Sequence, residues 1–411
     1  MDICSRQGAP AALMHMAVSR AGQLPLDFEY LELDGEPTQS ILEAVSQYFC
    51  RFRSFNWTCH PGCIDISRPA PLLREFRCYE WMCRIPRDFL GGCVGALRTL
   101  HLDGAIFPET CPALVTVTDL CVGSHESADD ACWFHRIFDL CPRLEVLHLS
   151  ELDGGPGDEL PAGPAPRTLR KVTLESSTSC NVLQLYAPWR LESVADVRLN
   201  NITMNPSLRL ASFIDGAVDV SVIYDGCRRA DIAALLSGAR KRKLQAEGSR
   251  DTKEDVAILA EMLRNGTALS HMESLRVSLN VLGPALEGAY HWPQLANLSV
   301  HVYTNDLTVR QTECPWFRWS VLNCLRAAPA LESLVLHVEA ERMTLDDALD
   351  LRGYLSTLAG CIPHEVQVYG FPGTIGRQLP AHDCDEPRVI FSEREPSILP
   401  FLDGAEDPWI C

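Results

Sequence analysis

The sequence of 411 residues lacks a long apolar run of the kind that a membrane-spanning helix requires. Its first segment, Met1–Ala21, also lacks the apolar core of a secretory leader, because charged residues interrupt it. We therefore expect a protein that has no membrane partner and is located in the cytoplasm, with the nucleus as the alternative.

Established catalytic and nucleotide-binding motifs are also missing. The chain contains no G-x-S-x-G, H-E-x-x-H, G-x-x-x-x-G-K-[ST] or G-x-G-x-x-G sequence. A glycine-rich stretch, Gly370–Gly376, has neither the spacing nor the lysine of a phosphate-binding loop, so a turn is the favoured interpretation. We expect no enzymatic activity, no catalytic residue and no cofactor.

Basic residues are in the minority. The chain has 36 Lys and Arg against 54 Asp and Glu, a formal net charge of −18, which argues against a general nucleic-acid binder. One basic run, Arg240–Lys243, matches a nuclear import signal or a nucleic-acid contact, but a solvated helix end is the favoured interpretation. No nucleic-acid partner is expected.

Cysteine is too sparse and too scattered for a secreted disulfide scaffold, with 18 residues spread along the chain. Many of them lie in apolar runs, as Cys121 and Cys324 do. We expect free thiols that pack as small apolar side chains in a reducing compartment.

One cysteine cluster has residue types that suit a metal. Cys59, His60 and Cys63, with Cys78 and Cys83 downstream, have spacings that a zinc site permits. Because Cys78 falls on an inward position of a predicted strand, a core thiol is the favoured interpretation. No metal site is predicted.

What the chain has in abundance is the leucine pattern L-x-x-L-x-L. It is clean at Leu97–Leu102, Leu144–Leu149 and Leu331–Leu336. With leucine required at all three positions, roughly one chance match is expected in a chain of this composition, so three copies carry information. Such a recurrence is typical of a leucine-rich-repeat solenoid, in which each copy contributes one short strand.

Proline and spacing support the same interpretation. A proline two residues before a copy ends the preceding helix and favours an extended chain; such prolines are Pro71, Pro142, Pro293 and Pro329. The best-supported copies are spaced by 20 to 27 residues and begin at Phe28, Phe52, Leu73, Leu97, Val117, Leu144, Leu169, Val194 and Ala217. After a gap of 55 residues the series resumes at Met272, Leu295, Leu331 and, as a last copy, Pro363.

We predict an α/β fold, an irregular leucine-rich-repeat-like solenoid over residues 1–375 with a mostly parallel curved sheet and outer helices. The helices are predicted at Ile41–Phe49, Ala128–Leu140, Trp316–Ala328 and Leu345–Leu358. Residues of about 226–271 are predicted as an insertion or an eroded repeat, with two further helices, Ala230–Lys243 and Lys253–Arg264. A capping or partly disordered tail is predicted over residues 376–411.

Function is expected on the sheet face that points away from the leucines, where strand alternation places the third and fifth residues of each copy. The third residues are Tyr30, Ser54, Glu75, Thr99, Asp119, Val146, Lys171 and Asp196, and the fifth are Glu32, Asn56, Arg77, His101, Cys121, His148, Thr173 and Arg198. We nominate Arg77, His101, His148, Lys171 and Arg198 as partner-binding residues, a locally basic group that suits an acidic segment of a protein. The alternative is that these side chains only keep the sheet soluble.

The chain resembles the F-box and leucine-rich-repeat-like proteins of mushroom-forming fungi. The segments that carry the resemblance are Ser19–Leu33, Ser67–Glu80, Ala96–Pro108, Phe138–Leu152 and Ala328–Val338. The resemblance implies a substrate receptor of a cullin-type ubiquitin ligase, whose F-box binds a Skp-type adaptor and whose repeats hold the target. An F-box opens with L-P-x-E-[ILV], and this opening is not found in the chain, where Leu24 and Pro25 continue into a strand-like run.

We therefore predict a non-catalytic protein-recognition scaffold, derived from such a substrate receptor, that binds a protein on the concave face of its sheet. A Skp-type adaptor is expected as a partner only if an F-box lies upstream of Met1. The alternative is a standalone interaction or inhibitor scaffold with no role in ubiquitin transfer.

Overall fold

The computed structural model describes residues 2–4, 10–31, 37–58, 64–79, 83–123, 134–150, 161, 163–175, 186–204, 210–225, 229–248, 252–264, 269–286, 292–303, 319–327, 331–339, 344–371, 374–378 and 387–392. Contacts between residues divide the chain into two compact units, Met1–Ile202 (unit 1) and Thr203–Cys411 (unit 2). Both units combine helices with a mostly parallel sheet, so the predicted α/β class is confirmed.

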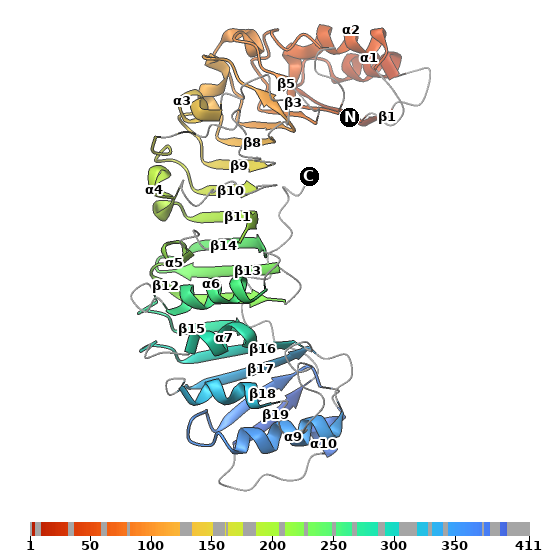
Figure 1. Cartoon of the computed structure of the whole chain (residues 1–411). Coiled ribbons are helices and arrows are strands. Elements are labelled where there is room, and N and C mark those ends of the chain that lie inside the picture. The colour runs from red at the N-terminus through yellow and green to blue at the C-terminus, as the bar shows by residue number, and fades with distance from the viewer. Residues whose placement is uncertain are drawn as a thin grey trace. The chain divides into compact units, whose positions relative to one another are not determined.

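The sheet of unit 1 consists of short strands that follow one another in the order of the chain. Its strands are β1 (Asp2–Cys4), β2 (Leu26–Leu31), β3 (Phe52–Trp57), β4 (Glu75–Cys78), β6 (Thr99–Leu102), β8 (Asp119–Gly123), β9 (Val146–Ser150), β10 (Lys171–Glu175) and β11 (Asp196–Thr203). Each of the described pairings between neighbours is parallel. Figure 1 shows β8 to β11 side by side.

The leucine pattern forms the core because its last two positions point to the same side of every strand. Leu147 and Leu149 of β9 pair with Leu120 and Val122 of β8, and all four side chains are at most 1% exposed. The same alignment continues on β10 and β11. Apolar residues thus stack from strand to strand, which is the arrangement that the repeat pattern predicts.

Short helical segments connect these strands. They are α1 (Pro10–Ala21), α2 (Gln39–Tyr48), η1 (Phe49–Arg51), η3 (Phe89–Gly92), η4 (Pro112–Thr116), η5 (Phe134–Arg136), α3 (Ile137–Leu140), α4 (Tyr186–Trp189) and η7 (Leu191–Ser193). The predicted helix Ile41–Phe49 corresponds to α2, and the described part of Ala128–Leu140 is helical. Two very short strands, β5 (Cys83–Arg84) and β7 (Ala105–Ile106), form a second parallel pair.

The first predicted copy is out of phase with the structure. Tyr30, predicted to point outward, is 1% exposed and pairs with Trp57, and their rings stack with centroids 4.8 Å apart. Phe28 pairs with Phe55, which is the fourth residue of the next copy. The first copy therefore begins three residues earlier, at Pro25, and an aromatic cluster replaces the leucines that set the phase elsewhere.

Unit 2 opens with an antiparallel hairpin where a helix was predicted. β12 (Ala217–Tyr224), β13 (Arg229–Leu236) and β14 (Arg240–Glu247) pair antiparallel in that order, so the helix predicted at Ala230–Lys243 is wrong. A turn at Gly238 and Ala239, both with positive φ, divides the segment. Alternate residues on each side of the turn are buried, which is the period of a strand.

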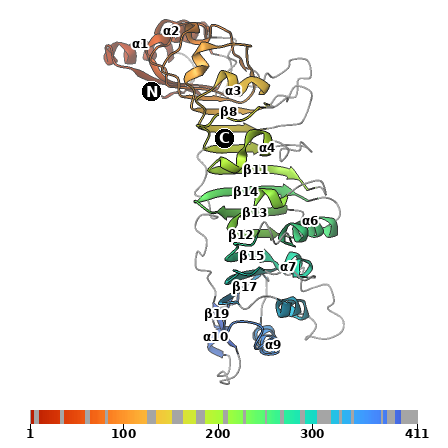
Figure 2. The same cartoon turned by 90° about the vertical axis from the view of Figure 1, so that its left-hand side faces the viewer.

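The rest of unit 2 returns to parallel pairing. β12 pairs in parallel with β15 (Ser274–Ser278), followed in order by β16 (Asn297–Tyr303), β17 (Ser333–Glu339), β18 (Glu365–Tyr369) and β19 (Arg388–Ser392). The helical segments are α5 (Leu210–Phe213), α6 (Thr252–Arg264), α7 (Leu279–Leu286), η9 (Ser320–Ala327), α9 (Leu345–Ser356) and α10 (Ile375–Gln378). In Figure 2, α6, α7 and α9 lie along one side of these strands.

Most predicted elements of this part are present. α6 and α9 match the predicted helices Lys253–Arg264 and Leu345–Leu358, and η9 is a 3₁₀ helix within Trp316–Ala328. β18 is the last predicted copy. Within the tail predicted to lack a repeat, β19 adds another parallel strand, with Val389 beside Val366.

The alternation along β9 leads to a stability prediction. Leu147 is fully buried, so Leu147→Ala should lower the free energy of unfolding by about 2–5 kcal/mol through lost burial and the cavity that remains. His148, which points to the other face and is half-buried, should tolerate alanine within about 0.5 kcal/mol. Urea titrations of both variants test this, and equal losses would show that the strand phase is wrong.

Candidate functional site

The candidate site is the face of the unit 1 sheet that points away from the buried leucines, which we name the polar face. Two rows of side chains cross it, with one residue of each row on every strand from β2 to β11. Row one is Asp27, Ser54, Glu75, Thr99, Asp119, Val146, Lys171 and Asp196, and row two is Glu29, Asn56, Arg77, His101, Cys121, His148, Thr173 and Arg198.

The structure brings the five nominated residues together on this face. Arg77, His101, His148 and Arg198 all belong to row two, and Lys171 lies in row one on β10. Neighbouring strands in a sheet are about 4.8 Å apart. The nominated residues therefore lie within one contiguous strip, as the repeat spacing predicts.

The polar face is not basic, however. Arg77 forms an ion pair with Glu75 on its own strand, at 2.5 Å, and Arg198 pairs with Asp196 at 3.2 Å. Among the described residues of the two rows, three cations (Arg77, Lys171, Arg198) face five carboxylates (Asp27, Glu29, Glu75, Asp119, Asp196). The prediction of a locally basic group was wrong, because it counted the cations without the acids placed two residues before them.

Hydrogen bonds occupy three of these carboxylates. Asn56 donates to Glu29 at 2.7 Å, and Ser54 donates to Glu75 at 3.3 Å, in both cases across neighbouring strands. Thr118 donates to Asp119, the next residue along the chain, at 2.5 Å. The cross-strand pairs hold neighbouring strands in register, and all three bonds fix their side chains, so the polar face is a preorganised surface.

The middle of row two is closely packed. His101 is 2% exposed, and its Nε2 atom is 3.4 Å from the Cys121 thiol. Burial lowers the pKa of His101 to about 4, and the positive charge of Arg77 acts in the same direction. His101 is therefore neutral at physiological pH. The Nε2 atom of His148 lies 4.0 Å from a carboxylate oxygen of Glu175, with which a protonated His148 would form an ion pair.

A third row, at the second position of each copy, lies beside row one and was not recognised in the sequence. This edge row consists of Arg53, Arg74, Arg98, Thr118, Glu145 and Arg170, whose backbone groups are hydrogen bonded from strand to strand. All four arginines are exposed. The signal that could have identified them is arginine directly after the first apolar residue of a copy, as in Phe52-Arg53, Leu73-Arg74, Leu97-Arg98 and Leu169-Arg170.

The edge arginines differ in their contacts. Arg53 forms an ion pair with Asp27, and this hydrogen bonding lowers the pKa of the carboxyl group. Arg98 donates to the carbonyl oxygens of Leu97 and Thr116 at 3.0 and 3.1 Å. Within the described part of the chain, the side chains of Arg74 and Arg170 have no hydrogen-bond or ion-pair partner.

Unit 2 has a ring stack on its sheet that sequence reasoning also missed. His301, His337 and Tyr369 come from β16, β17 and β18 in register. The His301 and His337 rings lie 4.4 Å apart at 13°, and the His337 and Tyr369 rings lie 5.4 Å apart at 19°. Arg276 donates to Nε2 of His301 at 2.7 Å. Burial lowers the pKa of His301 to about 2 and that of His337 to about 4.

Two residues of the cysteine cluster lie in the core. Cys78 and Cys83 are fully buried thiols, whereas Cys59, His60 and Cys63 lie outside the described residues. No group of three potential metal ligands occurs among the residues that the structure describes. Burial also raises the pKa of the Cys111 thiol to about 11, as expected of an unreactive core thiol.

The basic run Arg240–Lys243 is a strand and not a helix end. It forms the first half of β14, in which Lys241 and Lys243 are exposed while Arg242 is 1% exposed. Only alternate cations of the run are therefore accessible. This arrangement does not present four consecutive basic side chains to a partner.

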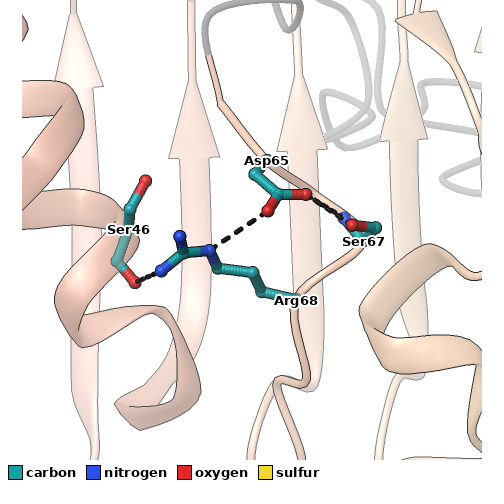
Figure 3. Close-up of polar contacts among 4 residues, drawn as sticks. All are labelled: Ser46, Asp65, Ser67 and Arg68. Atoms are coloured by element: carbon teal, nitrogen blue, oxygen red, sulfur yellow. Dashed lines mark hydrogen bonds and ion pairs between the residues drawn. The ribbon is translucent and has the colours of Figure 1, made fainter.

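Asp65, Ser67 and Arg68 form a polar cluster that has a structural explanation. Asp65 accepts hydrogen bonds from the hydroxyl group and the backbone N–H of Ser67 (Figure 3). Arg68 donates one hydrogen bond to the Asp65 carboxylate at 3.2 Å and another to the carbonyl oxygen of Ser46 in α2 at 3.1 Å. Hydrogen bonding from Ser67, with Arg68, lowers the pKa of Asp65. The cluster fixes a turn against α2 and occupies the carboxylate.

Comparison of the chain with protein-family models, with curated proteins and with solved structures found no match. In the described parts of the chain, no helix combines the length and apolar character needed to cross a membrane.

Proposed function

We propose that the chain is a non-catalytic protein-recognition scaffold built as an irregular leucine-rich-repeat-like solenoid, and that its polar face holds the partner. The observation that carries this proposal is the alignment of rows one and two, with one residue of each row on β2, β3, β4, β6, β8, β9, β10 and β11. Stacked repeats of this kind offer extended binding surfaces, because each repeat adds one increment of the same surface.

The composition of the polar face suits recognition better than chemistry. Its arginines are held by carboxylates on their own strands, and His101 is buried and neutral. A rigid arginine loses little conformational entropy when it binds a partner, which favours affinity. None of these contacts resembles an activated nucleophile with its base and orienting group.

We also propose that the scaffold derives from the substrate receptor of a cullin-type ubiquitin ligase. The segments that resemble the F-box and leucine-rich-repeat-like family supply β2, β4, β6, β9 and β17. A Skp-type adaptor would be a second partner if an F-box precedes Met1. Copurification of a Skp-type adaptor with this chain alone would contradict the expectation that the chain lacks its own adaptor-binding module.

Proximity labelling with the full chain tests the recognition role. We expect a labelled protein whose enrichment falls about tenfold or more in Arg77→Ala/Arg198→Ala, since truncation of central arginines removes hot-spot contacts. Arg143→Ala/Arg167→Ala, which removes two exposed arginines outside rows one and two, is the matched control and should change enrichment by less than about twofold. Enrichment that both double variants leave unchanged would contradict recognition through the polar face.

A further inference from the structure

The charged side chains of the polar face and of the edge row differ in whether they have hydrogen-bond or ion-pair partners among the described residues. The carboxylates Glu29, Glu75 and Asp119 each accept a hydrogen bond from a described neighbour. By contrast, Arg74 and Arg170 are exposed and have no side-chain partner among the described residues. Four of the six edge-row residues are arginines and one, Glu145, is an acid, so the edge row itself carries a surplus of positive charge.

We propose that the edge row binds an acidic segment of a protein, which crosses the strands in an extended conformation. This inference rests on the proposed recognition function and names the chemistry of the partner. Arg53, Arg74 and Arg98 occupy adjacent strands, with Arg74 N donating to Arg53 O at 2.7 Å and Arg98 N to Arg74 O at 2.8 Å. Like charges on neighbouring strands repel each other, and an anionic partner relieves that cost.

The dimensions of the edge row define the length of the segment. From Arg53 on β3 to Arg170 on β10 there are five strand intervals, which amount to about 24 Å. An extended chain covers about 3.3 Å per residue, so about seven residues span the row. Carboxylates at intervals along such a segment would meet Arg74, Arg98 and Arg170. Thr118 and Glu145, which lie between Arg98 and Arg170, would face neutral residues of the segment.

The charge of the whole chain does not prevent this interaction. Although the net charge is −18, ionic screening at physiological salt limits the reach of surface charges to about 8 Å. Distant acids of the chain therefore contribute little to the potential at the edge row, which depends on its four arginines, on Glu145 and on the adjacent row one residues. Arginine also pairs with carboxylates through two parallel hydrogen bonds, which favours this partner over a diffuse counterion cloud.

A nucleic acid is the less suitable polyanion. Its phosphates form a continuous series of negative charges, and a strand on the edge row would extend over the row one carboxylates Glu75, Asp119 and Asp196. A peptide can place its acidic side chains toward the arginines and its neutral ones toward row one. The arrangement of the two rows thus favours an acidic protein segment.

Fluorescence anisotropy with the full chain and a labelled seven-residue peptide of alternating glutamate and serine tests the proposal, because alternate residues of an extended chain point to opposite sides. We expect binding that weakens as the salt concentration rises. In Arg74→Glu/Arg170→Glu the affinity should fall by about tenfold or more. Arg143→Glu/Arg167→Glu makes the same change of charge at exposed arginines outside the edge row and should weaken binding by less than about threefold. Urea midpoints of both variants should match the wild type, because all four positions are exposed.

Equal weakening by the two variants, or no binding by the wild-type chain, would overturn the proposal. Tighter binding of a single-stranded oligonucleotide, with the same dependence on Arg74 and Arg170, would overturn the assignment to a protein segment. If the peptide fails to bind while the labelled partner still depends on Arg77 and Arg198, only this inference fails. If the peptide binds but the enrichment of the labelled partner is unchanged in Arg77→Ala/Arg198→Ala, the recognition role of rows one and two fails instead.

Discussion

Lowering the pH from 7 to 5 should reduce the free energy of unfolding of unit 2 by up to about 2 kcal/mol for each of His301 and His337. The pKa of a histidine in an unfolded chain is about 6.5, whereas burial lowers these two values to about 2 and about 4 in the fold. Between pH 6.5 and 4, the unfolded chain therefore binds protons that the folded chain does not, and stability falls as the pH falls.

The surroundings of the ring stack explain why protonation is so unfavourable. Arg276 of β15 donates to Nε2 of His301, so that nitrogen must act as an acceptor and the ring must stay neutral. His337 packs face to face with His301 on one side and with Tyr369 on the other. A proton on either imidazole would place a cation beside a buried ring and near a guanidinium group.

Urea titrations of the wild type and of His337→Phe at pH 7 and pH 5 test this expectation. Phenylalanine keeps an aromatic ring between His301 and Tyr369 but binds no proton. The loss of stability between the two pH values should therefore be about 1–2 kcal/mol smaller in the variant. His364→Asn, at an exposed histidine, is the control, and a pH dependence that His337→Phe leaves at the wild-type value would contradict the prediction.

The parallel sheet was predictable because the leucine pattern contains both the strand and its phase. In β6, β9 and β10, the spacing of three and then two residues places two apolar side chains on one face. That phase also places Arg77, His101 and His148 correctly on the other face. Where aromatic residues replace leucine, as at Phe28 and Tyr30, several phases fit the sequence equally well, and only the pairing with β3 decides between them.

Other features depend on contacts that no single segment contains. The alanines of β13 favour a helix locally, but pairing with β14 buries alternate residues and overrides that preference. β19 is a strand because β18 offers it a partner edge. Likewise, the neutralisation of Arg77 and Arg198 and the stacking of His301 on His337 arise from the packing of side chains, which a pattern of apolar positions does not describe.

Gly370 opens the glycine-rich stretch Gly370–Gly376, for which the sequence predicts a turn. It directly follows β18, its φ is +97°, and a Cβ atom there would lie 2.0 Å from the carbonyl oxygen of Val338. Gly123, at the end of β8, has the same relation to the preceding strand, with a Cβ position 1.9 Å from the carbonyl oxygen of Asp103. At both places the backbone of the neighbouring strand occupies the space that a side chain would need.

Gly370→Ala should therefore lower the free energy of unfolding by about 2–5 kcal/mol, through the cost of positive φ together with the overlap against backbone that cannot rotate away. Gly123→Ala should cost about 1–3 kcal/mol through the overlap alone. Gly95→Ala is the matched control, because nothing lies within 4 Å of its Cβ position, and it should change stability by no more than about 0.5 kcal/mol. Urea titration measures all three, and a Gly370→Ala variant as stable as Gly95→Ala would show that β17 and β18 do not approach each other as closely as this structure requires.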